Sequence, residues 1–401
     1  MSHHGFIHGI SIFFSILLGA LWLKLIVEGG WGVRSLADLT DAEWDYPFSP
    51  ECAPRLTIVV PGCNEEEAVR QALDSLAALD YPNYEIVAID DRSTDRTREI
   101  MEAMAGEARA RGDHPKVTVV HIKELPAGWL GKTHAMWTGA AATRSDWILF
   151  TDADCVFRPD CLRRALAYAE SSGADHLVIF PTMRMESWGE TMMFSFFQTL
   201  FNFAHRPWKV ADPRAPDHIG VGAFNLIRRS AYLQVGTYEA LRLSVVDDMD
   251  LGRLVKQHGL KQRVAFGEGL VSLRWAQGAL GVVNNLSKNL FAFFHFSWLR
   301  TLGAAAALAA VSLGPFAGLA AAGGWVKLGY GIAVASIAAV YVGMARKTRI
   351  SPLYFCLYPL AGILGVYAIL RSAFLATIHG GIVWRGTKYS LAELRQGQSG
   401  G

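Results

Sequence analysis

Two aspartates separated by one residue, Asp152 and Asp154, directly follow an apolar run at 146–151. Two carboxylates at the end of a buried strand can hold a hard divalent cation, which prefers oxygen ligands. Bound Mg²⁺ or Mn²⁺ keeps several waters and bridges to substrate phosphates. The same spacing recurs at Asp248 and Asp250, so the pattern alone is unspecific. The position after a strand favours a metal site over a solvated turn.

A second acidic group lies later in the chain, at Asp247, Asp248 and Asp250. Carboxylates this close repel one another unless a cation or a proton relieves them. Helical spacing follows, so the group is expected at a helix start. A carboxylate in that position can act as a general base, and the alternative is that it only caps the helix.

Lys132 follows Gly131 just ahead of an alanine-rich helical stretch. A lysine beside a close backbone approach is suited to a phosphate or diphosphate, although a plain surface lysine has the same local sequence. Asn64 and Glu65 follow one apolar run, and Asp90 and Asp91 end another. These polar residues gather at positions where strands are expected to end.

The elements that must position these residues alternate between strands and helices. Short β-branched runs are expected as strands at 56–60, 84–89, 117–121 and 146–151, with helical patterns between them. This alternation predicts a mostly parallel sheet with helices on both faces, in one continuous domain. Ligands of such sheets bind at the carboxyl ends of the strands, where the residues above would meet.

The composition indicates a soluble domain attached to membrane segments. The chain has 401 residues, of which 51% are hydrophobic and 18% are charged, against about 25% charged in an average soluble domain. Intrinsic disorder is excluded by the hydrophobic and aromatic content. The 38 basic residues are matched by 36 acidic ones, which argues against a nucleic-acid partner.

Four apolar stretches are long enough to be membrane segments: 6–27, 302–323, 328–345 and 353–378. The last contains Pro359, so it could be a tilted span, a kinked span or a re-entrant hairpin. The loop between 345 and 353 carries Arg346 and Lys347, so it is expected in the cytoplasm. Counting back through two spans puts the middle domain on the same side. Two aromatic segments, 188–208 and 290–299, are expected to lie in the membrane interface rather than in an ordinary core.

The middle domain resembles the family 2 glycosyltransferases, which have the GT-A fold. The resemblance covers about residues 55–290, and its motifs stand in the family's order. The matching stretches are Val59–Glu65, Ile89–Asp95, Gly131–Lys132, Thr151–Asp154, Gly220–Asn225 with Arg228 and Arg229, and Asp247–Leu251.

The resemblance implies a role for each matching residue. Glu65, Asp90, Asp91, Lys132, Asp152 and Arg274 would bind the nucleotide-sugar donor, and Asp152 and Asp154 would bind Mg²⁺ or Mn²⁺. Asp247 and Asp248 would be catalytic, with Asp248 as the general base of an inverting transfer. The remaining residues would bind the acceptor: Gly222, Phe224, Asn225 and Trp275.

The chain departs from the polymer-making members of this family at one motif. Processive synthases and glucosylceramide-type enzymes carry Gln-x-x-Arg-Trp, whereas this chain has Val271 in place of the glutamine, before Arg274 and Trp275. The departure favours transfer of a single sugar to a membrane lipid, with a UDP-sugar as the expected donor. Lys288 and Asn289 resemble a stretch of hopanoid- and carotenoid-associated members. The alternative is a small processive polysaccharide synthase.

The sequence therefore predicts an integral protein of a bacterial-type inner membrane, divided as follows: an anchor at 1–30, a GT-A catalytic domain at 50–290, a transmembrane region at 300–380 and a cytoplasmic tail at 381–401. The sugar, the acceptor and the oligomeric state are left open.

Overall fold

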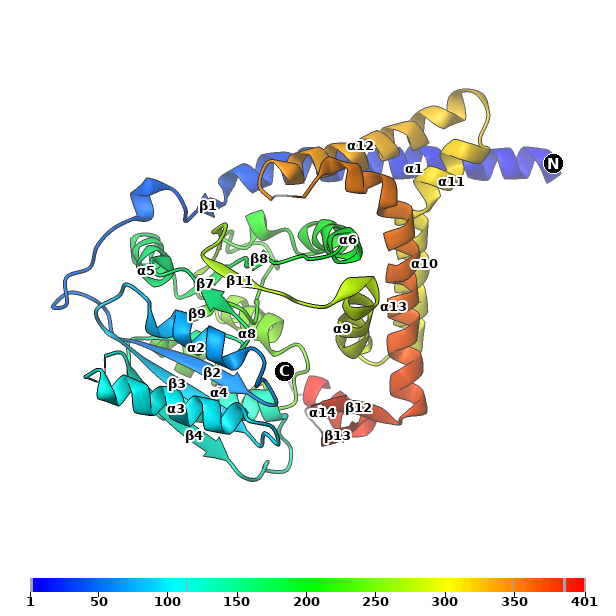
Figure 1. Cartoon of the computed structure of the whole chain (residues 1–401). Helices are drawn as coiled ribbons and strands as arrows, with labels where there is room; N and C mark the ends of the chain where they lie inside the picture. The colour runs from blue at the N-terminus through cyan, green and yellow to red at the C-terminus, as the bar shows by residue number, and fades with distance from the viewer. Residues whose placement is uncertain (1–2, 113, 349, 385–386, 400–401) are drawn as a thin grey trace. The chain divides into compact units, whose positions relative to one another are not determined.

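The computed structural model describes residues 3–112, 114–348, 350–384 and 387–399. The chain divides into two compact units that do not follow its linear order (Figure 1). A helical unit contains residues 1–35, 185–206 and 275–380. A catalytic unit contains residues 36–184, 207–274 and 381–401, so the C-terminal tail belongs to it.

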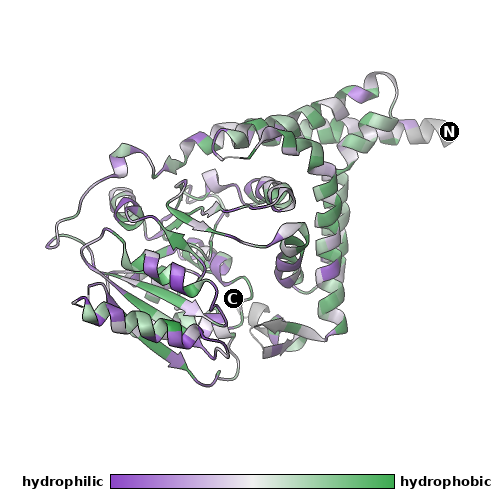
Figure 2. Cartoon of the chain, in the orientation of Figure 1, coloured by the Kyte–Doolittle hydropathy of each residue, from purple (hydrophilic) through white to green (hydrophobic). Residues whose placement is uncertain are grey.

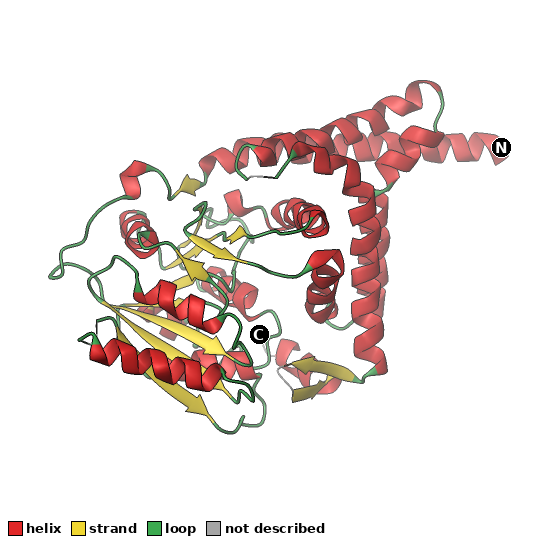
Figure 3. Ribbon diagram, in the orientation of Figure 1, coloured by secondary structure: helices red, strands yellow, loops and turns green. Residues whose placement is uncertain are grey.

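The catalytic unit is built on an eight-stranded sheet (Figure 3). Only β9 is antiparallel to its neighbours, so the prediction of a mostly parallel sheet is confirmed. In the order in which they pair, the strands are β1 (Ala37–Asp38), β10 (Gln262–Phe266), β7 (His176–Ile179), β9 (Asn225–Arg228), β5 (Trp147–Phe150), β2 (Leu56–Gly62), β3 (Tyr84–Asp91) and β4 (Lys116–Ile122).

Two hydrophobic clusters cover the two faces of this sheet. Adjacent residues of β2 belong to different clusters, Val59 to one and Val60 to the other, because side chains alternate along a strand. Three helices pack into the cluster of Val60: α2 (Val69–Ala77), α3 (Thr97–Ala110) and α5 (Cys161–Ser171). Three pack into the cluster of Val59: α4 (Gly131–Ala141), α7 (Arg229–Gln234) and α8 (Asp247–Gln257).

Smaller elements complete the catalytic unit. A three-stranded sheet pairs β6 (Val156–Phe157), β11 (Val271–Leu273) and β8 (Thr182–Met183). The tail forms a hairpin of β12 (Gly381–Trp384) and β13 (Thr387–Ser390), followed by α14 (Leu391–Ser399). Short 3₁₀ helices lie at Ala42–Trp44 and Pro207–Lys209.

The helical unit consists of helices that carry hydrophobic residues along much of their length (Figure 2). Its helices are α1 (His3–Gly32), α6 (Trp188–His205), α9 (Gly278–Phe293), α10 (Trp298–Ser312), α11 (Gly314–Ala321), α12 (Lys327–Ala345) and α13 (Tyr358–Ile378), with 3₁₀ turns at Val33–Ser35, Gly324–Val326 and Pro352–Leu357.

Within the described residues, three helical segments are long and apolar enough to cross a membrane: His8–Ser35, Gly324–Ala345 and Pro352–Ile378. The apolar stretch 302–323 is instead divided between α10 and α11, which are bent by 48°. The last apolar stretch is one continuous helix rather than a hairpin, because Pro359 lies in its first turn, where proline is tolerated.

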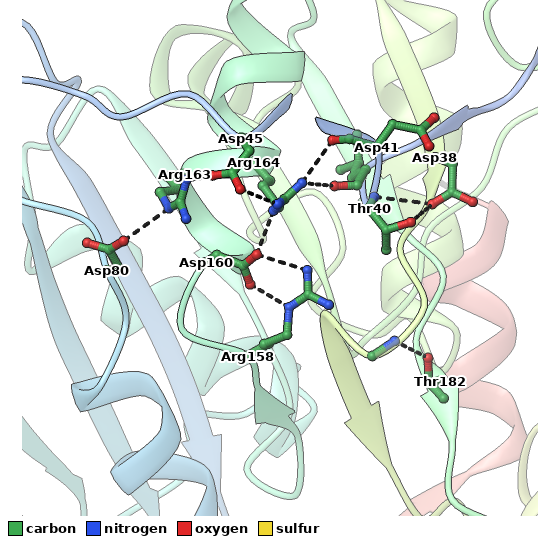
Figure 4. Close-up of polar contacts among 12 residues, drawn as sticks. Asp38, Thr40, Asp41, Asp45, Asp80, Arg158, Asp160, Arg163, Arg164 and Thr182 are labelled. Carbon is green, nitrogen blue, oxygen red and sulfur yellow. Dashed lines mark hydrogen bonds and ion pairs between the residues drawn. The ribbon is translucent and has the colours of Figure 1, made fainter. Parts of the chain in front are cut away.

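A buried arginine ties the segment that follows α1 to the catalytic unit (Figure 4). The Arg164 guanidinium on α5 donates to the carbonyls of Leu39 and Asp41 and pairs with Asp45 at 2.6 Å. It also pairs with Asp160 at 2.6 Å, so every side of this buried group has an acceptor. The arrangement fixes where the chain leaves α1.

Replacing Arg164 by methionine should therefore destabilise the catalytic unit. The change removes the donor of the buried Leu39 carbonyl and one of the two arginines beside Asp45 and beside Asp160, which keep Arg163 and Arg158. We therefore expect the free energy of unfolding to fall by about 1–3 kcal/mol. Arg96→Met is the matched control, because Arg96 forms an exposed ion pair with Glu66 and should lose less than about 1 kcal/mol. Chemical unfolding in detergent measures both, and equal losses would contradict the prediction.

Candidate active site

The carboxyl ends of the central strands bring one lysine and several carboxylates together. Lys132, in the first turn of α4, lies 2.9 Å from Asp152, which follows β5. The same ammonium lies 3.7 Å from Asp247, the buried first residue of α8. Three residues that the sequence singled out, from distant parts of the chain, therefore meet around the Lys132 ammonium.

The backbone of Gly222 links the two acidic motifs. Its amide donates to Asp248 Oδ2 at 2.9 Å, and its carbonyl accepts from the Asp152 amide at 3.1 Å. A Cβ atom at this position would lie 2.4 Å from Asp152 Oδ2 and 3.3 Å from Lys132 Nζ, so only glycine allows the approach. Gly222 therefore contacts both the metal motif and the candidate base through its backbone atoms.

The charge on Lys132 is stabilised by the surrounding carboxylates. Burial alone would lower the pKa of this lysine, but Asp152, Asp247 and Asp248 together raise it well above its usual range. The side chain is therefore a fixed positive charge at neutral pH. This is the property that a ligand of an anionic diphosphate requires.

Asp154 carries a negative charge that its surroundings disfavour. Burial and the neighbouring Asp152 raise its pKa to about 6. A divalent cation between two such carboxylates would relieve both effects, so Asp152 and Asp154 fit a Mg²⁺ or Mn²⁺ ion that completes its shell with water and phosphate oxygens. Within the described ranges, no group of three or more histidine, cysteine or acidic residues could hold a metal by itself.

Asp248 lies in the first turn of α8 and has an elevated proton affinity. Burial is the main cause of its raised pKa, opposed by Lys132 and by the amides of Met249 and Gly222. Asp250 has a different role, because it accepts from Ser244 at 2.5 Å and pairs with Arg253 at 3.0 Å. Of the three clustered aspartates, only Asp247 and Asp248 therefore face Lys132.

The first strands supply a second group of candidate donor ligands. Asp91 is fully buried and accepts from Arg92 Nε at 2.8 Å. Asp90 caps the amide of Ser93 and contacts His121, which gives it a structural role beside Asp91. The Glu65 amide donates to Thr97 Oγ1 at 2.7 Å, which fixes the turn after β2.

The C-terminal hairpin lies at this same donor end, which the sequence did not reveal. Arg92 Nη1 donates to Thr387 Oγ1 at 3.1 Å. Tyr389 is buried, and the charges of Arg92 and Asp91 both affect its pKa, which burial raises.

Phe224 and Asn225, which follow Gly222, have side chains that are buried in the core. Phe224 is fully buried and packs near Phe157. Asn225 Oδ1 accepts from His176 Nε2 at 2.5 Å, and Gln262 donates to the other nitrogen of this histidine. Their side chains support the loop from the core, which differs from the acceptor contacts expected of them.

Arg274 and Trp275 stand at the boundary of the two units. Arg274 follows β11 and is the last residue of its segment of the catalytic unit. Trp275 begins the next segment of the helical unit, where its ring lies 5.0 Å from that of Phe197. Its carbonyl accepts from Asn285 Nδ2 at 2.5 Å.

The chain is similar to curated enzymes and to a solved structure. It is 23% identical over 250 residues to 4,4'-diaponeurosporenoate glycosyltransferase of Staphylococcus haemolyticus, covering 62% of this chain and 64% of that protein. The Staphylococcus aureus (strain USA300) enzyme of the same name is 24% identical over 228 residues, or 55% of this chain. The matched regions span less than two thirds of these relatives' length, 64% and 56%.

The fold is similar to that of the mannosyltransferase PcManGT from Pyrobaculum calidifontis, solved with GDP-Man and Mn²⁺. That structure superposes with a TM-score of 0.55 at 18% identity, over 92% of this chain and 99% of that one. At this identity the likeness shows the GT-A fold alone.

Two family models match the sequence. The model of Glycosyl transferase family 2 matches residues 57–236, which include every strand-end motif from Glu65 to Asn225. The model of Glycosyl transferase family group 2 matches residues 147–370, which is more than half of the chain. The protein is therefore a glycosyltransferase and belongs to family 2.

Proposed function

We propose that this enzyme transfers one sugar from a nucleotide-diphosphate donor, preferably a UDP-sugar, to a membrane lipid with inversion of configuration. The observation that carries the proposal is the direct linkage of Lys132, Asp152, Gly222 and Asp248. Gly222 bonds through its backbone to both Asp152 and Asp248, and Lys132 pairs with Asp152, so a diphosphate ligand and a base would lie close to one glycine.

The donor half of the reaction depends on Lys132 and the strand-end carboxylates. Lys132 offers a fixed charge to the diphosphate, while Asp91 and Glu65 would contact the base and ribose. Mg²⁺ or Mn²⁺ on Asp152 and Asp154 would neutralise charge on the leaving diphosphate. Arg274 is a further cation for this group.

The acceptor half depends on Asp248. Its carboxylate takes the proton of the acceptor hydroxyl as that oxygen attacks the anomeric carbon. The bond from this carbon to the diphosphate oxygen breaks, and the nucleoside diphosphate leaves with the electron pair. Since attack comes from the opposite face, an α-linked donor gives a β-linked product. The raised pKa of Asp248 suits this proton transfer.

Three features support a lipid acceptor. Apolar helices precede and follow the catalytic segments, the glutamine of the polymer motif is replaced by Val271, and the similar staphylococcal enzymes are named for a carotenoid acceptor. A processive synthase remains the second candidate because Arg274 and Trp275 are retained.

The decisive experiment is a donor screen with the purified enzyme in detergent. Release of nucleoside diphosphate is followed with and without Mg²⁺ or Mn²⁺, in the presence of a total lipid extract and labelled nucleotide sugars. We expect label in a single-sugar lipid product. Label found only in a long water-soluble polymer would reject the lipid-acceptor proposal in favour of the synthase.

Asp248→Asn should lower kcat by about 100- to 10,000-fold, because the amide cannot take the acceptor's proton. Nucleotide binding should be little changed, since the hydrogen bond from Gly222 can still be accepted. Asp250→Asn is the control, because that side chain contacts Ser244 and Arg253, and its kcat should stay near the wild-type value. Full activity of Asp248→Asn would exclude this residue as the base.

Metal binding should weaken as the pH falls below about 6, where Asp154 takes up a proton. The limiting slope is a tenfold loss of affinity per pH unit for one competing proton. Calorimetric titration of Mn²⁺ in the presence of nucleoside diphosphate between pH 5 and 8 measures it. Asp154→Asn should remove this slope, and an unchanged slope in the variant would assign the titration to another group.

Thr387→Val should raise the KM for the donor about three- to tenfold, because Arg92 loses a hydrogen-bond partner and orients Asp91 less well. The kcat should change little. Lys388→Ala is the matched control, since this neighbouring side chain is exposed. An equal KM in wild type and Thr387→Val would show that the tail does not affect the donor.

A further inference from the structure

The last apolar helix, α13, has the length and composition of a membrane span. We propose that α13 does not cross the bilayer but lies along the leaflet on the catalytic side, with both of its ends on that side. The partner of its exposed face is therefore the interfacial region of a single lipid leaflet. Four observations within the two units lead to this inference.

The first observation is that α1 and α12 run in the same direction. Ser15 on α1 donates to the carbonyl of Val326, just ahead of α12, and Gly19 then packs against the backbone of Gly329. These two contacts advance together along both helices, whereas the longer Tyr330 side chain reaches back to the Ser11 carbonyl. Figure 1 shows both helices running from the end marked N. Parallel helices that enter a membrane together reach the same side at their C-terminal ends.

The second observation places that side. The catalytic unit begins directly after α1, and β1 pairs with β10 in its sheet. The Arg164 contacts hold the following residues on α5. The C-terminal end of α1 is therefore on the catalytic side, and so is the end of α12. Arg346 and Lys347 follow α12, which agrees with the positive-inside rule for a cytoplasmic catalytic unit.

The third observation concerns the other end of α13. The tail hairpin begins at Gly381, and Thr387 bonds to Arg92 within the catalytic unit. The chain thus leaves α13 on the catalytic side, the side from which it entered. Because α13 is continuous, it cannot turn back inside the bilayer, so it does not cross.

The fourth observation is the polar helix beside α13. Ser287 on α9 donates to the Ala368 carbonyl at 3.4 Å, and Ser372 accepts from the Phe291 amide at 2.9 Å. The two helices run parallel in this register, so the exposed Lys288 lies beside the middle of α13. A crossing α13 would carry this lysine to the bilayer centre, where a charge is strongly disfavoured.

The exposed face of α13 is suited to an interface. Exposed side chains recur at helical spacing, with Ile363 at 54%, Tyr367 at 51%, Phe374 at 56% and Ile378 at 62%. Arg371 lies on the same stripe and can extend to the headgroups. Helices that lie on a membrane combine such apolar and basic residues.

The bend between α10 and α11 follows from this arrangement. Trp298 on α10 bonds to Thr377, and Leu308 approaches Gly365, so α10 lies antiparallel along α13. It shares the interfacial position of α13, and the chain turns into the bilayer at the bend. The helices α11 and α12 then form the pair that enters and returns beside α1.

Cysteine labelling tests the inference on the full chain. In a variant with the native cysteines replaced by alanine, Ser351→Cys before α13 and Ala392→Cys after it are treated with a membrane-impermeant maleimide. We expect both to react in inverted vesicles and neither in spheroplasts. A cysteine added ahead of Met1 should react only in spheroplasts. Reaction of Ser351→Cys and Ala392→Cys from opposite sides would overturn the proposal.

Depth measurement provides a second readout that does not depend on sidedness. A spin label at Tyr367→Cys, in the middle of α13, should show the shallow depth of a headgroup-level site. The reference is a label at Phe13→Cys, an exposed position of α1. Equal, central depths for the two labels would show that α13 spans the bilayer. Loss of transferase activity alone would leave both readouts unaffected, so this test is independent of the proposed function.

Discussion

The site depends on the backbone of one residue, Gly222, which binds the metal motif with its carbonyl and the candidate base with its amide. The loop keeps this position because buried groups hold it from behind. Gln262 bonds to both backbone groups of Ile219, and His176 bonds to Asn225. Burial lowers the pKa of His176 to about 4, so this support is uncharged at neutral pH. The catalytic geometry thus rests on a neutral buried network.

The charge balance of these residues favours a cationic ligand. Lys132 compensates Asp152 and Asp247 directly, yet Asp154 and Asp248 both keep raised pKa values. One fixed positive charge is therefore insufficient for the four carboxylates. A divalent cation at Asp154 would leave Lys132 to meet a diphosphate, while the buried Asp248 keeps its raised pKa.

The fold and the strand-end residues were predictable because they depend on local patterns. β-Branched runs identified the strands, and parallel strands bring their carboxyl ends to one edge, so Asp91 and Asp152 could be assigned to one edge of the sheet from the sequence. Phe224 and Asn225 are buried, which the sequence did not indicate, because motif position does not show which way a side chain points. Thr387 was missed because its contact with Arg92 joins residues 295 positions apart.

Two helices of the helical unit and the candidate donor site are joined through the chain itself. Helix α9 begins shortly after Arg274, and α13 ends just before the hairpin that carries Thr387 and Tyr389. The parallel pair α9 and α13 thus continues at one end from a candidate diphosphate ligand and at the other into the contacts of Arg92. If α9 and α13 lie in one leaflet, their depth in that leaflet limits the paths of two chain connections, the one from Arg274 into α9 and the one from α13 into the tail hairpin. An enzyme acting on a lipid hydroxyl gains from this constraint, because the reacting group of such a lipid lies at the same interface.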